Sequence, residues 1–236
     1  MSHTVPAPPR VIDAQFVAGA SRVEQLPPPQ HLEVAFAGRS NVGKSSLMNA
    51  LLERRKLVRT SSTPGCTRQI SLFDVTTRLG TRLTMVDLPG YGYAKRSKTE
   101  RAEWAELIHA YLLQRPALSL VVALCDLRRG REEDDELLLE LLQQAPARSR
   151  PPVGLIWVAT KIDKLPMSSR KLTLQRLEAK TGHSWIGFST ELPDTQERLW
   201  RRILRQLDLD QPSTLAAVDA PPGAAGRSEA EGSEPG

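Results

Sequence analysis

The chain contains two cysteines among its 236 residues, Cys66 and Cys125, and they are too far apart for a metal-ligand spacing. The sequence therefore supports neither a disulfide framework nor a zinc site. Long apolar runs are also missing, because the longest, ALSLVVALC, is about half of the roughly 20 residues that a membrane-spanning helix needs. The proline-rich start, MSHTVPAPPR, lacks the apolar segment of a signal peptide. We therefore expect a cytoplasmic protein without a membrane span.

Charge is distributed unevenly along the chain. The formal net charge is +5, but the last 26 residues hold four acidic residues against one arginine, which leaves +8 on residues 1–210. A basic body of this kind favours contact with nucleic acid or another polyanion, and the same charge is also compatible with solubility alone. Residues 209–236 are poor in large apolar side chains, so we expect a disordered acidic C-terminal tail.

Between the two ends, short β-rich apolar runs alternate with longer helical patterns. Strands are expected at 33–37, 69–75, 82–87, 118–125, 153–159 and 184–188, and helices at 44–53, 98–114, 132–144, 168–181 and 194–207. The alternation predicts a doubly wound α/β domain over residues 20–208 with a mostly parallel, six-stranded sheet. Residues 1–19 would form an N-terminal extension that is flexible at its start. The segment QISLFDVTTRLGTRLTMVDL is typical of a hairpin turning at Leu79-Gly80, which would give the sheet one antiparallel edge strand.

The stretch GRSNVGKSS, between an expected strand and an expected helix, matches the phosphate-loop pattern G-x-x-x-x-G-K-[ST]. Glycines at 38 and 43 would let the backbone curl so that its N–H groups face a β-phosphate. Lys44 would neutralise phosphate oxygens, and Ser45 would offer its hydroxyl to Mg²⁺. The alternative is an ordinary turn with a capping serine, which the strand-loop-helix context disfavours.

A second motif, VDLPG, indicates a loop that senses the γ-phosphate. Asp87 ends an expected strand, where its carboxylate could hold Mg²⁺ through water. Gly90 could offer its N–H to the γ-phosphate, and the spacing suits a loop that registers whether this phosphate is present.

Two downstream motifs indicate that the base is guanine. In ATKIDK, Asp163 could accept two hydrogen bonds from guanine N1–H and its 2-amino group, a pattern that adenine cannot offer. The Lys161 stem could cover the ring, and Thr160 could brace the loop. GFST, at 187–190, follows the next strand and could present backbone N–H groups to guanine O6.

The stretch RTSSTPGCTRQ lies between the phosphate loop and VDLPG and would supply a second protein ligand of Mg²⁺. Thr67 is the candidate that we select, bound only when the γ-phosphate is present. Composition alone leaves Thr60, Ser62 and Thr63 as alternatives.

These elements occur in the order found in translation-factor-related P-loop GTPases with a Ras-like G domain. The strings FAGRSNVGKSSLMNALL, TPGCTRQISLFDV, DLPGYGYAKRSK and CDLRRGREEDD closely resemble the EngB family of ribosome-biogenesis GTP-binding proteins, from about residue 20 to residue 207. The resemblance implies binding of GTP or GDP with Mg²⁺. It also implies a partner in the large ribosomal subunit or its precursor, including rRNA, and a role in normal cell division and septation.

Carried over by position, the resemblance implies a set of nucleotide contacts in five segments. They are Gly38, Arg39, Ser40, Asn41, Val42, Gly43, Lys44 and Ser45; Gly65, Cys66, Thr67, Arg68 and Gln69; Asp87, Leu88, Pro89 and Gly90; Thr160, Lys161, Ile162 and Asp163; and Phe188, Ser189 and Thr190. Mg²⁺ falls on Ser45 and Thr67. The chain departs from the family at Cys66, where a basic residue is frequent, at Thr190, where serine is usual, and in its acidic tail. These departures concern details of the switch contacts and the role of the tail.

Hydrolysis is expected to depend on Lys44, Asn41, Thr67 and Gly90. Ras-like GTPases place a water-orienting Gln directly after the last glycine of D-x-x-G, but this chain has Tyr91 there. A phenol lacks the paired donor and acceptor of an amide, so we predict slow unassisted turnover. The resemblance to K⁺-stimulated GTPases suggests that Asn41 helps to hold K⁺ near the phosphates. The alternative is that Asn41 only stabilises the loop.

Three basic stretches are candidate rRNA contacts, each with a solvated surface as the alternative. They are GYGYAKRSKTER with Lys95, Arg96, Lys98 and Arg101; ERRKLVR; and the last helix with Arg198, Arg201, Arg202 and Arg205. The sequence thus predicts a monomeric, GTP-dependent switch for ribosome assembly. The alternative is a P-loop ATPase or small-molecule phosphotransferase without a ribosomal role, which TKID disfavours.

Overall fold

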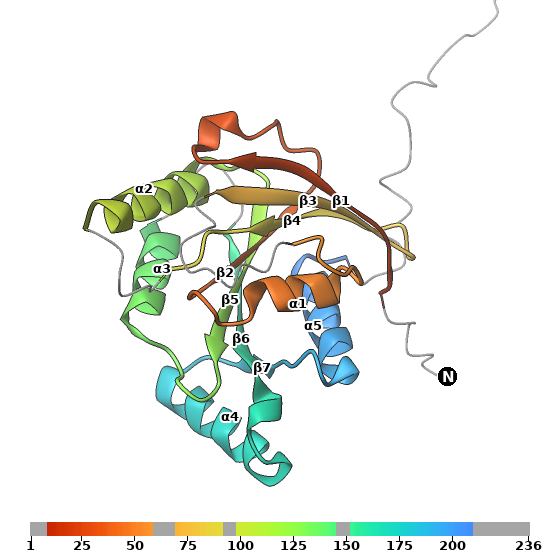
Figure 1. The fold of residues 1–236 in the computed structure, drawn as a ribbon, viewed down its shortest axis with the longest axis vertical. Coiled ribbons are helices and arrows are strands. Elements are labelled where there is room, and N and C mark those ends of the chain that lie inside the picture. The colour runs from red at the N-terminus through yellow and green to blue at the C-terminus, as the bar shows by residue number, and fades with distance from the viewer. Residues whose placement is uncertain (1–8, 59–68, 92–97, 145–151, 210–236) are drawn as a thin grey trace, which may run out of the picture.

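The computed structural model describes residues 9–58, 69–91, 98–144 and 152–209 (Figure 1). Within these ranges the strands are β1 (Val11–Ala20), β2 (Glu33–Gly38), β3 (Ile70–Thr77), β4 (Arg82–Asp87), β5 (Leu118–Asp126), β6 (Gly154–Thr160) and β7 (Trp185–Gly187). The α-helices are α1 (Lys44–Leu51), α2 (Lys98–Gln114), α3 (Glu133–Gln144), α4 (Met167–Thr181) and α5 (Pro193–Gln206). Short 3-10 turns lie at Val23–Gln25 and Ile162–Lys164. The helices and six of these strands match the expected ranges closely.

The described strands form one sheet in the order β1-β3-β4-β2-β5-β6-β7. Strands β4, β2, β5, β6 and β7 pair in parallel, as the doubly wound fold requires. The expected hairpin is present: β3 and β4 are antiparallel, and Gly80 in the connecting turn has φ +82°, a left-handed value that glycine adopts without strain. The α/β fold class is confirmed.

The expectation of six strands is wrong, because a seventh, β1, covers the outer edge of β3. The expected N-terminal extension pairs, from Val11 onward, antiparallel with β3 along the whole of that strand. The pairing shifts register twice, between Val11 and Asp13 and between Phe16 and Ala18. These irregularities break the two-residue alternation that identifies a half-buried strand, so the sequence pattern concealed it. β3 is therefore the second strand of the sheet, and β1 is the edge strand.

Two apolar layers cover the two faces of the sheet. In β2, Val34 and Phe36 face α1 and α5, whereas Ala35 and Ala37 face α2 and α3. Alternate residues of a strand point to opposite faces, so a strand buried on both faces is apolar throughout. α1 and α5 lie together in Figure 1, and α4 lies beside β7. Among the described helices, none is long and apolar enough to cross a membrane.

Candidate functional site

The phosphate loop connects the carboxyl end of β2 to the first turn of α1. Asn41 has φ +64°, and Gly43 has φ +104° and ψ +15°, so the chain turns back on itself before the helix begins. A side chain at position 43 would be strained in this conformation, which accounts for the glycine. The Leu47 N–H donates to the Gly43 carbonyl at 2.9 Å and starts the helix. The first amides of α1 therefore lie at the loop, where a phosphate is favoured.

Lys44 and Asp87 form a buried ion pair at the base of this loop. The Lys44 side chain is 9% exposed and the Asp87 side chain 6%. Lys44 is the first residue of α1, which follows β2, and Asp87 is the last residue of β4. Because β2 and β4 pair in parallel, the two residues lie at the same edge of the sheet. Each charge neutralises the other in a place where neither could remain alone at low cost.

Mg²⁺ is implied by the fold family, and the donor atoms at this position fit it. Mg²⁺ prefers oxygen ligands and uses few protein groups in nucleotide sites. The Asp87 carboxylate and the Ser45 hydroxyl, one position beyond Lys44 on α1, supply such oxygens. Thr67, the other expected ligand, lies outside the described residues, as do Gly65, Cys66 and Arg68. Gln69 is described and is exposed just before β3.

The VDLPG loop packs directly against the phosphate loop. A Cβ at Gly90 would lie 3.2 Å from Ser40 Oγ and 3.4 Å from Ser40 Cα, so glycine permits this close approach. The Ser40 N–H donates to the Tyr91 carbonyl at 2.8 Å. Leu88 is buried, and the Trp104 indole N–H donates to the Pro89 carbonyl at 2.8 Å. The two phosphate-facing motifs are therefore joined through the backbone.

Tyr91 is turned into the core on the side of α3. Its hydroxyl donates to Asp135 Oδ1 at 2.5 Å, and its ring packs edge-to-face on Trp104. Asp135, which is 1% exposed, also accepts from the Glu132 N–H at 2.9 Å and from the Cys125 thiol at 3.5 Å. Burial raises the pKa of the Cys125 thiol well above its usual range, and the Asp135 charge adds to this effect, so the thiol stays protonated and can donate.

A second link from the phosphate loop reaches the same helix start, because Arg39 forms an ion pair with Glu132. Sequence reasoning missed both Asp135 and Glu132. They belong to the charge-rich run REEDD, which resembles an ordinary solvated helix start.

The guanine motif is held against the phosphate loop by two side chains. The Thr160 hydroxyl lies 2.7 Å from the Val42 carbonyl, and the Lys161 ammonium donates to the Asn41 carbonyl at 2.7 Å. Lys161 has φ +59°, a conformation that is costly for a lysine and is compensated by these contacts. The loops expected to hold the base and the phosphates therefore lie side by side at the carboxyl edge of the sheet.

Asp126, at the end of β5, holds the Lys161 ammonium from the other side and was not predicted. Its Oδ2 lies 3.2 Å from Lys161 Nζ, and Arg128 donates two side-chain hydrogen bonds to the carboxylate, of 2.9 and 2.6 Å. Arg128 keeps the pKa of Asp126 well below its usual range, so the carboxylate stays charged. In the sequence, the run CDLRRG supports the family resemblance but does not by itself indicate a role for Asp126 or Arg128.

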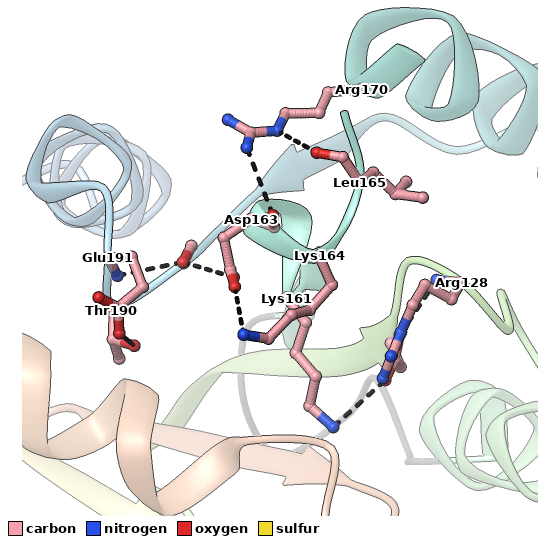
Figure 2. A network of polar contacts seen from close by, with 10 residues as sticks. Arg128, Lys161, Asp163, Lys164, Leu165, Arg170, Thr190 and Glu191 are labelled. Carbon is pink, nitrogen blue, oxygen red and sulfur yellow. Dashed lines mark hydrogen bonds and ion pairs between the residues drawn. The ribbon is translucent and has the colours of Figure 1, made fainter. Parts of the chain in front are cut away.

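Asp163 is fixed in one orientation by neighbours on both sides (Figure 2). The Ser189 hydroxyl donates to its Oδ1 at 2.7 Å, and Lys164 Nζ lies 3.1 Å from its Oδ2. Ser189 first, and then Lys164, hold the pKa of the Asp163 carboxyl below its ordinary value, against the opposing effect of burial. An ionised, oriented carboxylate can accept the paired hydrogen bonds of a guanine edge.

The GFST segment is tied to the same loop, but its backbone donors are partly engaged. The Phe188 N–H donates to the Ala159 carbonyl at 2.8 Å, and the Ser189 N–H donates to Thr195 Oγ1 at 3.1 Å. Thr195, a buried residue of α5, was not predicted from the sequence. The Thr190 N–H makes no hydrogen bond within the described residues.

The chain is similar in sequence to known GTP-binding proteins. A family model described as 50S ribosome-binding GTPase matches residues 33–161, more than half of the chain. The chain is 41% identical over 197 residues to the probable GTP-binding protein EngB of Geobacter metallireducens, covering 82% of this chain and 92% of that protein. With the probable EngB of Anaeromyxobacter sp. strain K, identity is 40% over 218 residues, covering 89% and 98%.

Solved structures agree on the fold. A crystal structure of a probable GTP-binding protein engB matches with a TM-score of 0.55 and 23% identity, over 75% of this chain and 98% of that one. Era in complex with MgGDPNP and a 16S rRNA fragment matches with a TM-score of 0.56 and 24% identity, over 75% and 57%. The family model and the sequence relatives show that the chain is a P-loop GTPase and belongs to the EngB family.

Proposed function

We propose that this GTPase is a cytoplasmic, monomeric switch for assembly of the large ribosomal subunit, and that normal cell division and septation depend on it. The name of the matched family, 50S ribosome-binding GTPase, supports a partner in that subunit. The basic charge of residues 1–210 supports contact with its rRNA. The observation that supports the switch role most directly is the backbone hydrogen bond from Ser40 to Tyr91, because it connects the phosphate loop to the loop that ends at Gly90.

In this proposal the nucleotide contacts are the five segments named from the sequence. Lys44 and the amides of 38–45 hold the phosphates, Ser45 and Thr67 hold Mg²⁺, and Asp163 reads the base. Bound Mg²⁺ would neutralise phosphate charge during transfer to water. Gly90 follows the γ-phosphate, and its displacement after hydrolysis releases the ribosomal particle.

The buried position of Tyr91 supports slow unassisted hydrolysis. Tyr91 is 3% exposed and its hydroxyl donates to Asp135, so its side chain faces the core rather than a water beside the γ-phosphate. A residue in this arrangement does not replace a water-orienting glutamine. Turnover would therefore await the ribosomal partner or a monovalent cation.

Asn41 is the residue that we propose for K⁺. Its main chain is fixed by Lys161, and its side chain is exposed, without a hydrogen bond to another described residue. GTP hydrolysis should be faster in KCl than in NaCl at equal ionic strength, and Asn41→Ser should remove the difference. Equal wild-type rates in the two salts would eliminate the K⁺ role while leaving the switch proposal standing.

Co-sedimentation with 50S subunits and with their precursors tests the ribosomal role directly. Wild type should sediment with the particles when bound to a non-hydrolysable GTP analogue and should remain in the supernatant with GDP or without nucleotide. The Asp163→Asn variant should require the xanthosine analogue for the same effect, which controls for nucleotide-independent charge attraction. Sedimentation that is equal in all three nucleotide states would contradict the switch.

A further inference from the structure

The outer face of α4 carries three basic side chains that are not neutralised. Lys171, Arg176 and Lys180 are exposed, and none forms an ion pair within the described part of the chain. Glu178, the one acidic residue of the helix, is engaged elsewhere, because its carboxylate accepts the Trp185 N–H at 3.1 Å. At ~1.5 Å per residue the three cations extend over roughly 13 Å along the helix: Arg176 and Lys180 are one turn apart on one side of its exposed half, and Lys171 lies on the opposite side of that half. A phosphate backbone that crosses the exposed half of α4 would therefore meet cations on both sides.

The basic face of α5 is different, although it has the same number of basic residues as α4. Arg198 pairs with Asp194 at 2.9 Å and Arg201 pairs with Glu197 at 2.6 Å, both one turn apart. These pairs leave less charge for an outside partner. Of the two helices, α4 therefore offers the stronger attraction for a polyanion.

The inner face of α4 packs against the sheet. Leu177 is buried and Leu174 Cδ1 would lie 3.2 Å from a Cβ at Gly187, so these apolar side chains pack on the sheet. The exposed apolar side chains are Met167 and Leu172, too few for the broad apolar face with which a helix enters a membrane surface. Charge attraction to a phosphate backbone fits this face better than insertion into lipid.

α4 is also fastened to the loop that presents Asp163 (Figure 2). Arg170, in the first turn of α4, donates to the Leu165 carbonyl at 2.9 Å and to the Asp163 carbonyl at 3.5 Å. A partner docked on α4 would therefore lie beside the base-binding end of the site.

We propose that the outer face of α4, formed by Lys171, Arg176 and Lys180, is a docking surface for the phosphate backbone of rRNA. This inference rests on the proposed ribosomal function and assigns a surface to it. The face has no exposed aromatic side chain for base stacking, so it binds through phosphates, and its contribution falls as salt rises.

The test compares the full-length wild type with two triple variants. One replaces Lys171, Arg176 and Lys180 by Gln, which retains helix propensity. The matched control replaces Arg198, Arg201 and Arg202 of α5 by Gln. Each protein, with a non-hydrolysable GTP analogue, is titrated with 50S subunits and with naked 23S rRNA between 50 and 200 mM KCl, and GDP affinity serves as the check of folding.

The α4 variant should bind both targets at least tenfold more weakly at the lowest salt, with a slope of log K against log salt that is about 2 to 3 smaller. The α5 control should change less, and GDP affinity should stay at the wild-type value in both variants. Wild-type affinity and slope in the α4 variant would overturn the α4 surface while leaving the ribosomal function intact. An equal loss in both variants would also overturn it, because the attraction would then be general.

Two further outcomes would refute a site for rRNA. Weakened binding to 50S subunits with unchanged binding to naked 23S rRNA would indicate a ribosomal protein instead. Lost binding to phosphatidylglycerol vesicles with unchanged 50S binding would indicate lipid. If wild type bound neither 50S subunits nor 23S rRNA in any nucleotide state, the proposed function itself would fail, and this inference with it.

Discussion

The base-reading and phosphate-facing parts of the site are prepared differently for a ligand. Asp163 is ionised and oriented by Ser189 and Lys164, with its loop fastened to the phosphate loop through Lys161. Lys44, by contrast, is paired with Asp87 inside the protein. In the proposed site the base-reading carboxylate is thus already oriented in the resting fold, whereas phosphate and Mg²⁺ would have to rearrange an existing ion pair. Specificity for guanine should therefore survive changes that strongly affect phosphate affinity.

The largest effect is expected from Lys44→Ala. It removes the cation that we propose for the phosphates and leaves Asp87 as a buried charge without its ion-pair partner. We expect the affinity for GDP and GTP to fall by about 3 kcal/mol, a factor of roughly a hundred, in a titration with fluorescent nucleotide. Lys180→Ala is the matched control, because this exposed lysine in the last turn of α4 lies outside all five proposed nucleotide segments and should matter little for nucleotide affinity. A Lys44→Ala protein that bound GDP within threefold of wild type would refute the assigned role.

Asp87→Asn should reduce the effect of Mg²⁺ on nucleotide binding without weakening binding of the nucleotide itself. With the carboxylate gone, Lys44 is released for phosphate, so GDP should bind in EDTA at least as tightly as to wild type. The tightening of GTP binding on adding Mg²⁺ should shrink about tenfold, the value of one hydrogen bond to a charged group. Asp74→Asn, on β3 and hydrogen-bonded to Thr84 at 2.7 Å, is the control and should keep the full Mg²⁺ effect. The same Mg²⁺ response in both variants would contradict the exchange of partners.

Ser189→Ala should weaken base reading without altering phosphate binding. It removes the 2.7 Å hydrogen bond that orients Asp163, so GDP affinity should fall by about 1.5 kcal/mol, roughly tenfold. Affinity for inorganic pyrophosphate should not change. The neighbouring Thr190→Ala, exposed in the structure, should cost less than twofold. If pyrophosphate binding weakened as much as GDP binding, the two parts of the site would not be separable as we describe.

The smallest effect concerns pH. Because the pKa of Asp163 is lowered from 3.8, the carboxylate is ionised above that value and loses its charge only as the pH falls through the lower folded pKa. The preference for GDP over IDP, which share the diphosphate, should therefore stay constant within twofold from pH 8 to pH 5. A preference that declined steadily across this range would show that Asp163 titrates near neutrality.

The strand and helix pattern of the parallel core was predictable because those segments are apolar on both faces and are bounded by loops with known motifs. β1 was not, because its register shifts and exposed Ile12 and Phe16 conceal a strand stabilised by pairing with β3. In general, a strand defined by its partner rather than by its own pattern escapes sequence analysis.

In the proposed site, motifs predict Lys44, Asp87 and Asp163 because each ends a strand, follows one or begins a helix at a fixed spacing. The contacts made by the residues around the site were harder to predict from the sequence. Tyr91 and Asp135 are 44 positions apart, and nothing in either local sequence indicates that they meet. The pairing of Lys44 with Asp87 likewise depends on the adjacency of β2 and β4, which periodicity alone does not give.

The most direct test of the central claim is nucleotide competition on wild type and Asp163→Asn, with GDP, XDP and ADP against one fluorescent reporter. Wild type should select GDP and reject both competitors. The variant, whose amide offers a donor where the carboxylate accepted, should select XDP over GDP while rejecting ADP as before. Retained selection of GDP by the variant would contradict the account, because base recognition would then lie elsewhere than in Asp163 and the side chains that orient it.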